Sequence, residues 1–180
     1  GFDCAVTVPA DPGLHRFYAL QGFGECFRNR EFTVEGRPGK LSPGCVIRRC
    51  GGAEYALQRE ELLKGTIHVA YGVELLNYQW DLCEKSGGGL YALQLEGVTG
   101  CACVECQPDG SALVKELLLP PGREEEGIAL LAAELGERRY TVRVPDDKGT
   151  PFGMLRWYRN DIAFSWDWVN TGGYLGLAFD

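Results

Sequence analysis

Three cysteines have the residue type and spacing of a metal site. Cys101, Cys103 and Cys106 form a C-x-C-x-x-C cluster, and thiolates at such spacings can bind zinc. A tetrahedral site needs a fourth ligand, and neither His15 nor His68 is close to the cluster in the sequence. A strand here would place Cys101 and Cys103 on one face and Cys106 on the other. We therefore predict small buried thiols and no metal.

The remaining cysteines do not indicate a disulfide framework. The chain has eight cysteines spread thinly over 180 residues that include many ordinary core residues. Disulfide-rich domains are short and secreted, and no segment of this sequence resembles a signal peptide. We expect all eight thiols to be reduced.

The charge balance limits the partners. The formal net charge is -7 and the pI is near 4.9, whereas nucleic-acid binding relies on clustered Lys and Arg. No apolar run approaches the about 20 residues that span a bilayer. We predict a soluble, cytoplasmic protein with no nucleic-acid partner and no membrane partner.

The elements that must position these residues fall into two groups. In the first, a short apolar run at residues 4–8 predicts a strand, a helix follows Pro12, and Gly22 lies where a left-handed helix cap is expected. Gly, Pro, Ser and charged residues at 34–44 have the composition of a linker.

The second group begins after the linker. Its predicted elements are a strand at 45–50, helices at 54–63 and 69–82, strands at 90–95, 100–106 and 112–119, a helix at 124–135, and strands at 138–144, 151–158 and 173–179. The Gln-Pro-Asp-Gly turn at 107–110 predicts an antiparallel hairpin. The second predicted helix has Val69, Val73, Leu76 and Tyr78 to Trp80 at amphipathic spacing. We predict an α+β fold with a mixed, mostly antiparallel sheet flanked by helices.

This element order resembles the fold of GCN5-related N-acetyltransferases. Residues 1–35, including the run "VPADPGLHRFYALQGF", resemble the last segment of that family, and residues 45–180 resemble a second, divergent copy without its fourth helix. Together the two parts resemble the multidomain enhanced-intracellular-survival acetyltransferases. The first residue is Gly1 and the single methionine is Met154, so we expect the chain to begin part-way through a longer protein. The predicted domains are 1–35, a linker at 36–44, and 45–180.

The resemblance implies acetyl-CoA as cofactor of the intact parent and a small-molecule or peptide amine as acceptor. Its coenzyme A cradle is a Q/R-x-x-G-x-G/A turn at a helix N-terminus, where unpaired N–H groups bind phosphate. Here Arg123 and Gly127 enclose one extra residue and three glutamates, Glu124 to Glu126. At an effective dielectric of about 20, two like charges 4 Å apart repel by roughly 4 kcal/mol. We predict a degenerate turn and no cofactor bound by this chain.

Tyr18 is the one catalytic residue that the resemblance implies. A phenol with a pKa near 10 is protonated at neutral pH and can donate to the departing coenzyme A thiolate as a general acid. The alternative reading is a core tyrosine packed beneath Phe17. His15 and His68 are interpreted as surface or boundary residues.

The leading hypothesis is thus the C-terminal portion of an N-acetyltransferase, whose intact domain is non-catalytic and shapes a substrate cleft or an oligomer. The alternative is a sterol-carrier-like module that binds a lipid or small ligand. Its pocket would be lined by the aromatic residues Trp157, Trp166, Trp168 and Tyr174, which otherwise pack a core or an interface. The apolar faces of residues 1–35 should dock on the second domain or on another copy of the chain.

Overall fold

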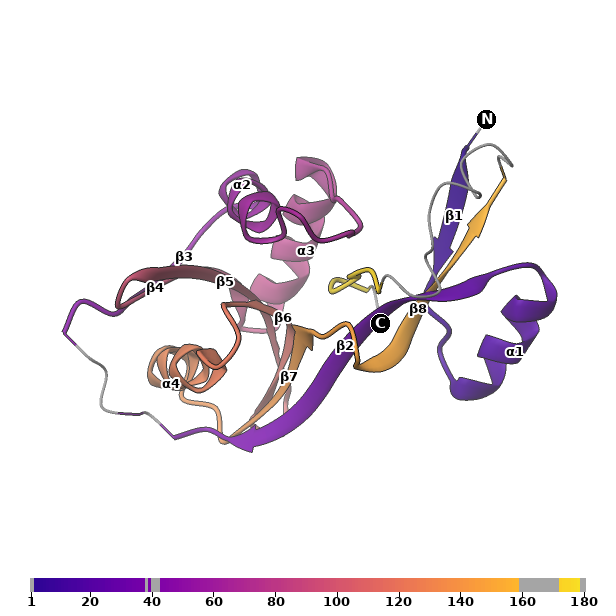
Figure 1. Cartoon of the computed structure of the whole chain (residues 1–180). Helices are drawn as coiled ribbons and strands as arrows, with labels where there is room; N and C mark the ends of the chain where they lie inside the picture. The colour runs from indigo at the N-terminus through magenta and orange to yellow at the C-terminus, as the bar shows by residue number, and fades with distance from the viewer. Residues whose placement is uncertain (1, 38, 40–42, 159–171, 179–180) are drawn as a thin grey trace. The chain divides into compact units, whose positions relative to one another are not determined.

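The computed structural model describes residues 2–37, 39, 43–158 and 172–178, which contain eight strands and four helices (Figure 1). In chain order the elements are β1 (Cys4–Thr7), α1 (Pro12–Leu20), β2 (Gly24–Glu35), β3 (Val46–Arg49), α2 (Gly52–Leu62), α3 (Val73–Lys85), β4 (Gly89–Leu95), β5 (Val98–Cys106), β6 (Ser111–Leu118), α4 (Glu124–Leu135), β7 (Arg139–Pro145) and β8 (Thr150–Trp157).

The strands are hydrogen-bonded in the order β1-β8-β2-β7-β6-β5-β4-β3. The pairs β1–β8, β2–β8, β3–β4, β4–β5 and β5–β6 are antiparallel, and β6–β7 is parallel. The predicted α+β class with a mostly antiparallel sheet is confirmed. No helix lies between β7 and β8, in agreement with the sequence.

The chain divides into two compact units. The first comprises Gly1–Arg30, Gly65–Val69 and Pro145–Asp180, and the second comprises Glu31–Lys64 and Ala70–Val144. The division falls inside β2, between Arg30 and Glu31, and the C-terminal residues group with the N-terminal ones. The domain boundary at 36–44 stays a prediction. Whether residues 1–35 come from a separate acetyltransferase domain stays a prediction.

In the first unit, β8 supplies the hydrogen-bonding partner of both N-terminal strands. Cys4 faces Trp157 in the β1–β8 register, and Gly24 faces Leu155 in β2–β8. The strand predicted at 173–179 is wrong for the described residues 172–178, where only isolated bridges of Gly173 to Phe27 and Tyr174 to His68 form. The β2–β8 register shifts on both sides of Phe27, the residue that bridges to Gly173.

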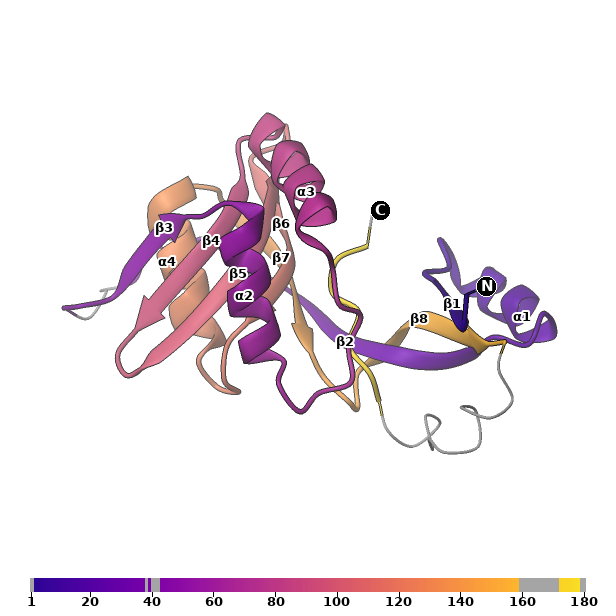
Figure 2. The ribbon, with the colours of Figure 1, turned by 90° about the horizontal axis from the view of Figure 1, so that it is seen from above.

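The second unit is a sheet covered on both faces (Figures 1 and 2). The α4 helix covers one face, where its apolar residues pack on β4 to β7. The α2 and α3 helices cover the other face, where they contact β4 and β5. The core on the α4 side contains Tyr91, Leu93, Ala102, Val104, Ala112, Val114, Leu117, Ile128, Leu131, Ala132, Tyr140, Val142 and Val144.

Capping side chains and glycines mark several ends of the helices and strands. Asp11 caps α1 by accepting from the backbone N–H groups of Gly13 and Leu14. The α4 helix spans the predicted residues and ends before Gly136, whose φ of 71° is left-handed. Gly110, at φ 78°, closes the predicted β5–β6 hairpin.

The buried face of α3 differs from the predicted amphipathic stripe. Its buried residues are Leu76, Gln79 and Cys83, whereas Val73 and Tyr78 are exposed. A polar residue takes a core position because the hydrogen bonds of its amide nitrogen offset part of the cost of burial. Gln79 donates to Glu105 at 2.8 Å and to the Cys83 sulfur at 3.2 Å.

In the part of the chain that the structure describes, every helix is too short or too polar to cross a membrane.

Candidate functional site

A fully buried carboxylate lies at the centre of the second unit. Glu116 is on β6, and the α2 residues Tyr55 and Arg59 contact it. The Tyr55 hydroxyl donates to Glu116 Oε1 at 2.9 Å, and Arg59 Nε approaches both carboxylate oxygens at 3.0 and 3.1 Å. All three side chains are at most 1% exposed. The contacts pin one face of α2 to the sheet.

The electrostatics of this cluster favour structure over proton transfer. Burial raises the pKa of Tyr55 well above its ordinary value, so its phenol remains a neutral donor. The Arg59 guanidinium balances the Glu116 charge and also lies 4.9 Å from the centre of the Tyr71 ring. Both Glu116 oxygens accept hydrogen bonds in the protein interior, so the carboxylate holds α2 to β6.

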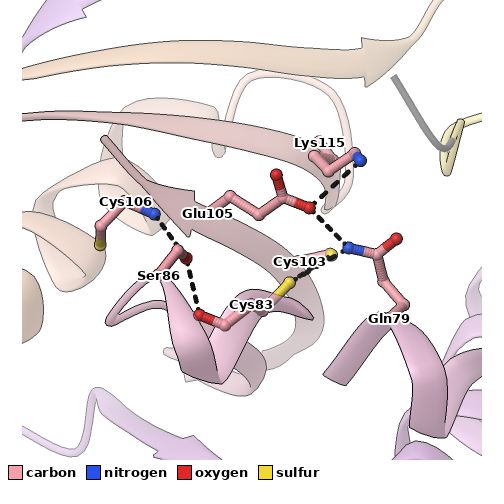
Figure 3. A network of polar contacts seen from close by, with 7 residues as sticks. All are labelled: Gln79, Cys83, Ser86, Cys103, Glu105, Cys106 and Lys115. Carbon is pink, nitrogen blue, oxygen red and sulfur yellow. Dashed lines mark hydrogen bonds and ion pairs between the residues drawn. The ribbon is translucent and has the colours of Figure 1, made fainter. Parts of the chain in front are cut away.

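A second polar network lies next to it, between α3 and the β5 and β6 strands (Figure 3). Glu105 Oε1 accepts from Gln79 at 2.8 Å and from the buried Lys115 ammonium at 3.2 Å. Gln79 also donates to Cys83, whose sulfur lies 3.5 Å from that of Cys103. This network brings two thiols into contact within the protein interior.

The turn before α4 is occupied by its own side chains. Arg123 forms an ion pair with Glu126, including an Nη2–Oε2 hydrogen bond of 2.8 Å, and also donates to the Glu96 carbonyl. The Gly122 N–H donates to Glu124 Oε2 at 2.8 Å. The pKa of Glu126 is lowered, chiefly by the hydrogen bond from Arg123, so the carboxylate is charged at neutral pH.

This turn does not fit the phosphates of coenzyme A. Its first helical turn carries Glu124, Glu125 and Glu126, and the Gly127 N–H already donates to the Arg123 carbonyl at 3.2 Å. Gly127 itself serves packing, because a Cβ there would clash with Leu119. The positive end of the helix dipole is therefore neutralised by the chain's own carboxylates.

The cysteine cluster lies in β5 as predicted. Cys101 and Cys103 are completely buried, and Cys106 is half-buried. Burial raises the pKa of Cys101 and of Cys103 well above the ordinary thiol value. Among the described residues no three His, Cys, Asp or Glu side chains gather as a metal site would need; freedom from metal stays a prediction that elemental analysis can test.

Tyr18 lies in the first unit, on a helix with no buried residue. Its ring makes edge-to-face contacts with Phe17 and Phe23, with centroid distances of 5.4 and 5.6 Å, so the predicted contact with Phe17 is present. A depression of about 410 Å³ is lined by other residues of the same unit: His15, Arg16, Ala19, Phe23, Gly24, Glu25, Arg28 and Met154. Tyr18 is not among them, and its catalytic role stays a prediction.

The described residues include three other predicted candidates, His15, His68 and Tyr174. His15 Nδ1 lies 3.1 Å from Glu25, and His68 Nδ1 lies 2.7 Å from the Thr66 carbonyl. Tyr174 is buried. Trp166 and Trp168 lie outside the described residues, so the proposed aromatic pocket is untested.

No protein-family model matches the sequence, and no curated protein matches it. Solved structures do. A probable N-acyltransferase from Enterococcus faecalis superposes with a TM-score of 0.59 at 15% identity, over 86% of this chain and 45% of its own. A GCN5-related N-acetyltransferase from Anabaena variabilis gives 0.58 at 9% identity, over 87% and 46%. The chain has the fold of GCN5-related N-acetyltransferases. It spans less than half the length of these structures.

Eis1 from Mycobacterium abscessus also matches, with a TM-score of 0.51 at 10% identity over 90% of this chain and 48% of that chain.

The sequence analysis singled out Tyr18 and the turn before α4. It missed the buried polar residues Arg59, Glu116 and Gln79. The available signal was the pair Lys115-Glu116 within the otherwise apolar strand run at 112–119. Two charges in such a run indicate buried partners from distant elements.

Proposed function

We propose that the chain is the C-terminal portion of an acetyl-CoA-dependent N-acetyltransferase and that its residues 45–180 form a non-catalytic acetyltransferase-like domain. In the whole protein this domain would shape the cleft for an amine substrate or support the oligomer. The fold likeness supports an acyltransferase in general. The acidic turn before α4 is the observation that carries the non-catalytic part.

The chemistry of that turn supports the proposal in two ways. The carboxylates of Glu124 and Glu126 already accept hydrogen bonds from Gly122 and Arg123. A pyrophosphate would have to displace these contacts and then lie beside three negative charges. The buried Arg59 offers no substitute site, because its guanidinium is paired with the Glu116 carboxylate in the protein interior.

Calorimetric titration of the chain with acetyl-CoA tests this proposal. We expect a dissociation constant no tighter than millimolar, about -4 kcal/mol of standard binding free energy, and no acetyl transfer to amines. Micromolar binding by the unaltered chain would overturn the proposal.

A charge-neutral variant shows whether the carboxylates cause the weak binding. The combined Glu124→Gln, Glu125→Gln and Glu126→Gln change should bind acetyl-CoA more tightly than the unaltered chain, because the like-charge repulsion is gone. Glu134→Gln, an exposed change on the same helix, is the matched control and should bind as the unaltered chain does.

Tyr18 is proposed as the general acid of the intact parent enzyme. Tyr18→Phe in that parent keeps the ring contacts with Phe17 and Phe23 but removes the proton. We expect kcat to fall by about 100-fold or more, in the range of general acid catalysis, with little change in KM. An unchanged kcat would leave Tyr18 with a packing role only.

The sterol-carrier-like alternative has no support among the described residues. The depression in the first unit is lined by His15, Arg16, Glu25 and Arg28 as well as by apolar side chains. None of its lining residues is one of the four aromatic residues that were predicted to line a lipid pocket.

A further inference from the structure

We propose that Cys83 and Cys103 form a redox-active dithiol, a modification site that peroxide converts into a disulfide between α3 and β5. Their sulfurs lie 3.5 Å apart, and both side chains are completely buried. A disulfide needs about 2.05 Å between the sulfurs. The remaining approach of about 1.5 Å is within the reach of a side-chain rotation.

The backbone holds the two thiols at this distance. The Ser86 hydroxyl donates to the Cys83 carbonyl at 2.7 Å and accepts from the Cys106 N–H at 3.1 Å, which links the end of α3 to the end of β5 (Figure 3). Gly88 lies two residues after Ser86, and a Cβ at this position would overlap the Val104 carbonyl oxygen. The contact between the sulfurs is therefore set by element packing rather than by two free side chains.

The surroundings assign different roles to the two sulfurs. The pKa of Cys83 is lowered, chiefly by the hydrogen bond from the Cys103 thiol and further by the Gln79 amide, while burial raises that of Cys103. The Gln79 amide donates to the Cys83 sulfur at 3.2 Å, which stabilises a thiolate there, so Cys83 is the sulfur that attacks. Cys103 is the resolving thiol.

Hydrogen peroxide is the oxidant in this reaction. The Cys83 thiolate attacks one peroxide oxygen, the O–O bond breaks, and the hydroxide that leaves takes up the proton lost from the thiol, giving a sulfenic acid and water. Cys103 sulfur then attacks the sulfenic sulfur, the S–O bond breaks, and the departing hydroxide takes the Cys103 proton as a second water. Two thiols and one peroxide become one disulfide and two waters. Because both sulfurs are buried, transient opening of α3 limits the rate.

Peroxide treatment of the whole chain tests the proposal. After alkylation in denaturant and digestion without reduction, we expect a single cross-linked peptide pair containing Cys83 and Cys103. Two of the eight thiols should be protected from alkylation, and the intact mass should fall by about 2 Da for the two hydrogens lost. A different cysteine pair, or eight alkylated thiols after treatment, would overturn the proposal.

Variants provide the matched comparison. Cys103→Ser should abolish the cross-link and leave Cys83 as a sulfenic acid that a dimedone probe traps. Cys26→Ser, a buried strand cysteine of the first unit, should leave the cross-link unchanged.

The oxidised unaltered chain should also melt at a higher temperature than the reduced chain, since the disulfide joins residues 20 positions apart. An equal or lower melting temperature would contradict a disulfide between α3 and β5. The mapping on the unaltered protein decides the pairing even if a variant fails to fold.

Discussion

The Glu116 carboxylate is completely buried, and hydrogen bonds from Arg59 and Tyr55 stabilise it there. Breaking one side of a buried ion pair costs more than the pair itself contributes, because the remaining charge is left without a partner. We expect Glu116→Gln to lower the free energy of unfolding by about 3 to 5 kcal/mol, measured by urea denaturation.

Two further variants serve as controls for the Glu116→Gln measurement. Tyr55→Phe removes only one hydrogen bond to Glu116 and should cost about 1 kcal/mol. Glu125→Gln, an exposed change on α4, should stay within about 0.5 kcal/mol. A Glu116→Gln effect no larger than that of Glu125→Gln would show that Arg59 finds another partner.

The Asp109 carboxyl, in the turn between β5 and β6, makes a contribution to stability that depends on pH. Hydrogen bonds from the Ser111 hydroxyl and backbone N–H lower the pKa of this exposed carboxyl. Its stabilising effect is therefore present above the ordinary pKa of the unfolded chain and is lost as the pH falls through the lowered folded value.

Carboxyl carbon shifts in an NMR titration measure this pKa directly. Ser111→Ala should move the Asp109 pKa upward toward its ordinary value, because the hydroxyl donor is gone. The pKa of Glu126, which the hydrogen bond from Arg123 lowers, should not move in the same variant. No change at Asp109 would assign its low pKa to the donors that remain, the Ser111 backbone N–H and Arg139, which pairs with it at 3.1 Å.

At the scale of elements, the end of α3 depends on one glycine. A Cβ at Gly88 would overlap the carbonyl of Val104 in β5, so Gly88→Ala must move the turn between α3 and β4 away from β5. We expect a loss of about 1 to 3 kcal/mol in unfolding free energy, as for overpacked sites, together with slower formation of the Cys83–Cys103 bond.

Gly72→Ser is the control for that variant. Gly72 is the N-cap of α3, has an ordinary φ of -66° and has open space at its Cβ position. Serine there should be neutral or stabilising by a few tenths of a kcal/mol. Equal losses for the two glycine variants would show that the close approach of Gly88 is relaxed at little cost.

Elements with local signals were predictable from the sequence, and those with distant partners were not. The α4 helix and the β5–β6 hairpin follow from Gly136 and from the Pro-Asp-Gly turn, which act within a few residues. The Arg59–Glu116 ion pair joins positions 57 residues apart, and no periodicity reports such a contact. The predicted stripe of α3 is right for Leu76 and Gln79, which are buried, and wrong for Val73 and Tyr78, which are exposed. The bonds of Gln79 to Glu105 and Cys83 are likewise contacts that periodicity does not report.

At the scale of the whole molecule, the first unit exposes apolar side chains that sequence reasoning expected to be covered. Phe17 and Leu20, three residues apart on α1, are 54 and 78% exposed. Exposed apolar patches commonly mark association surfaces, and we propose self-association through this surface.

Light scattering over a concentration series tests that proposal. The mean mass should rise with concentration, and Phe17→Glu with Leu20→Glu should keep the chain monomeric. Leu57→Glu, at an exposed leucine of the second unit, should not change the association. A monomer at all concentrations would contradict self-association.

The pairing of β1 with β8 has a consequence for synthesis on the ribosome. In the sheet order β1 is an edge strand whose neighbour is β8, and β8 begins at residue 150 whereas β1 ends at residue 7. At about 5 to 20 residues per second, the nascent β1 waits roughly 7 to 28 seconds for its partner. During that interval its unpaired edge is a template for the wrong strand, so the yield of folded protein should depend on translation speed and on holding chaperones more than on final stability.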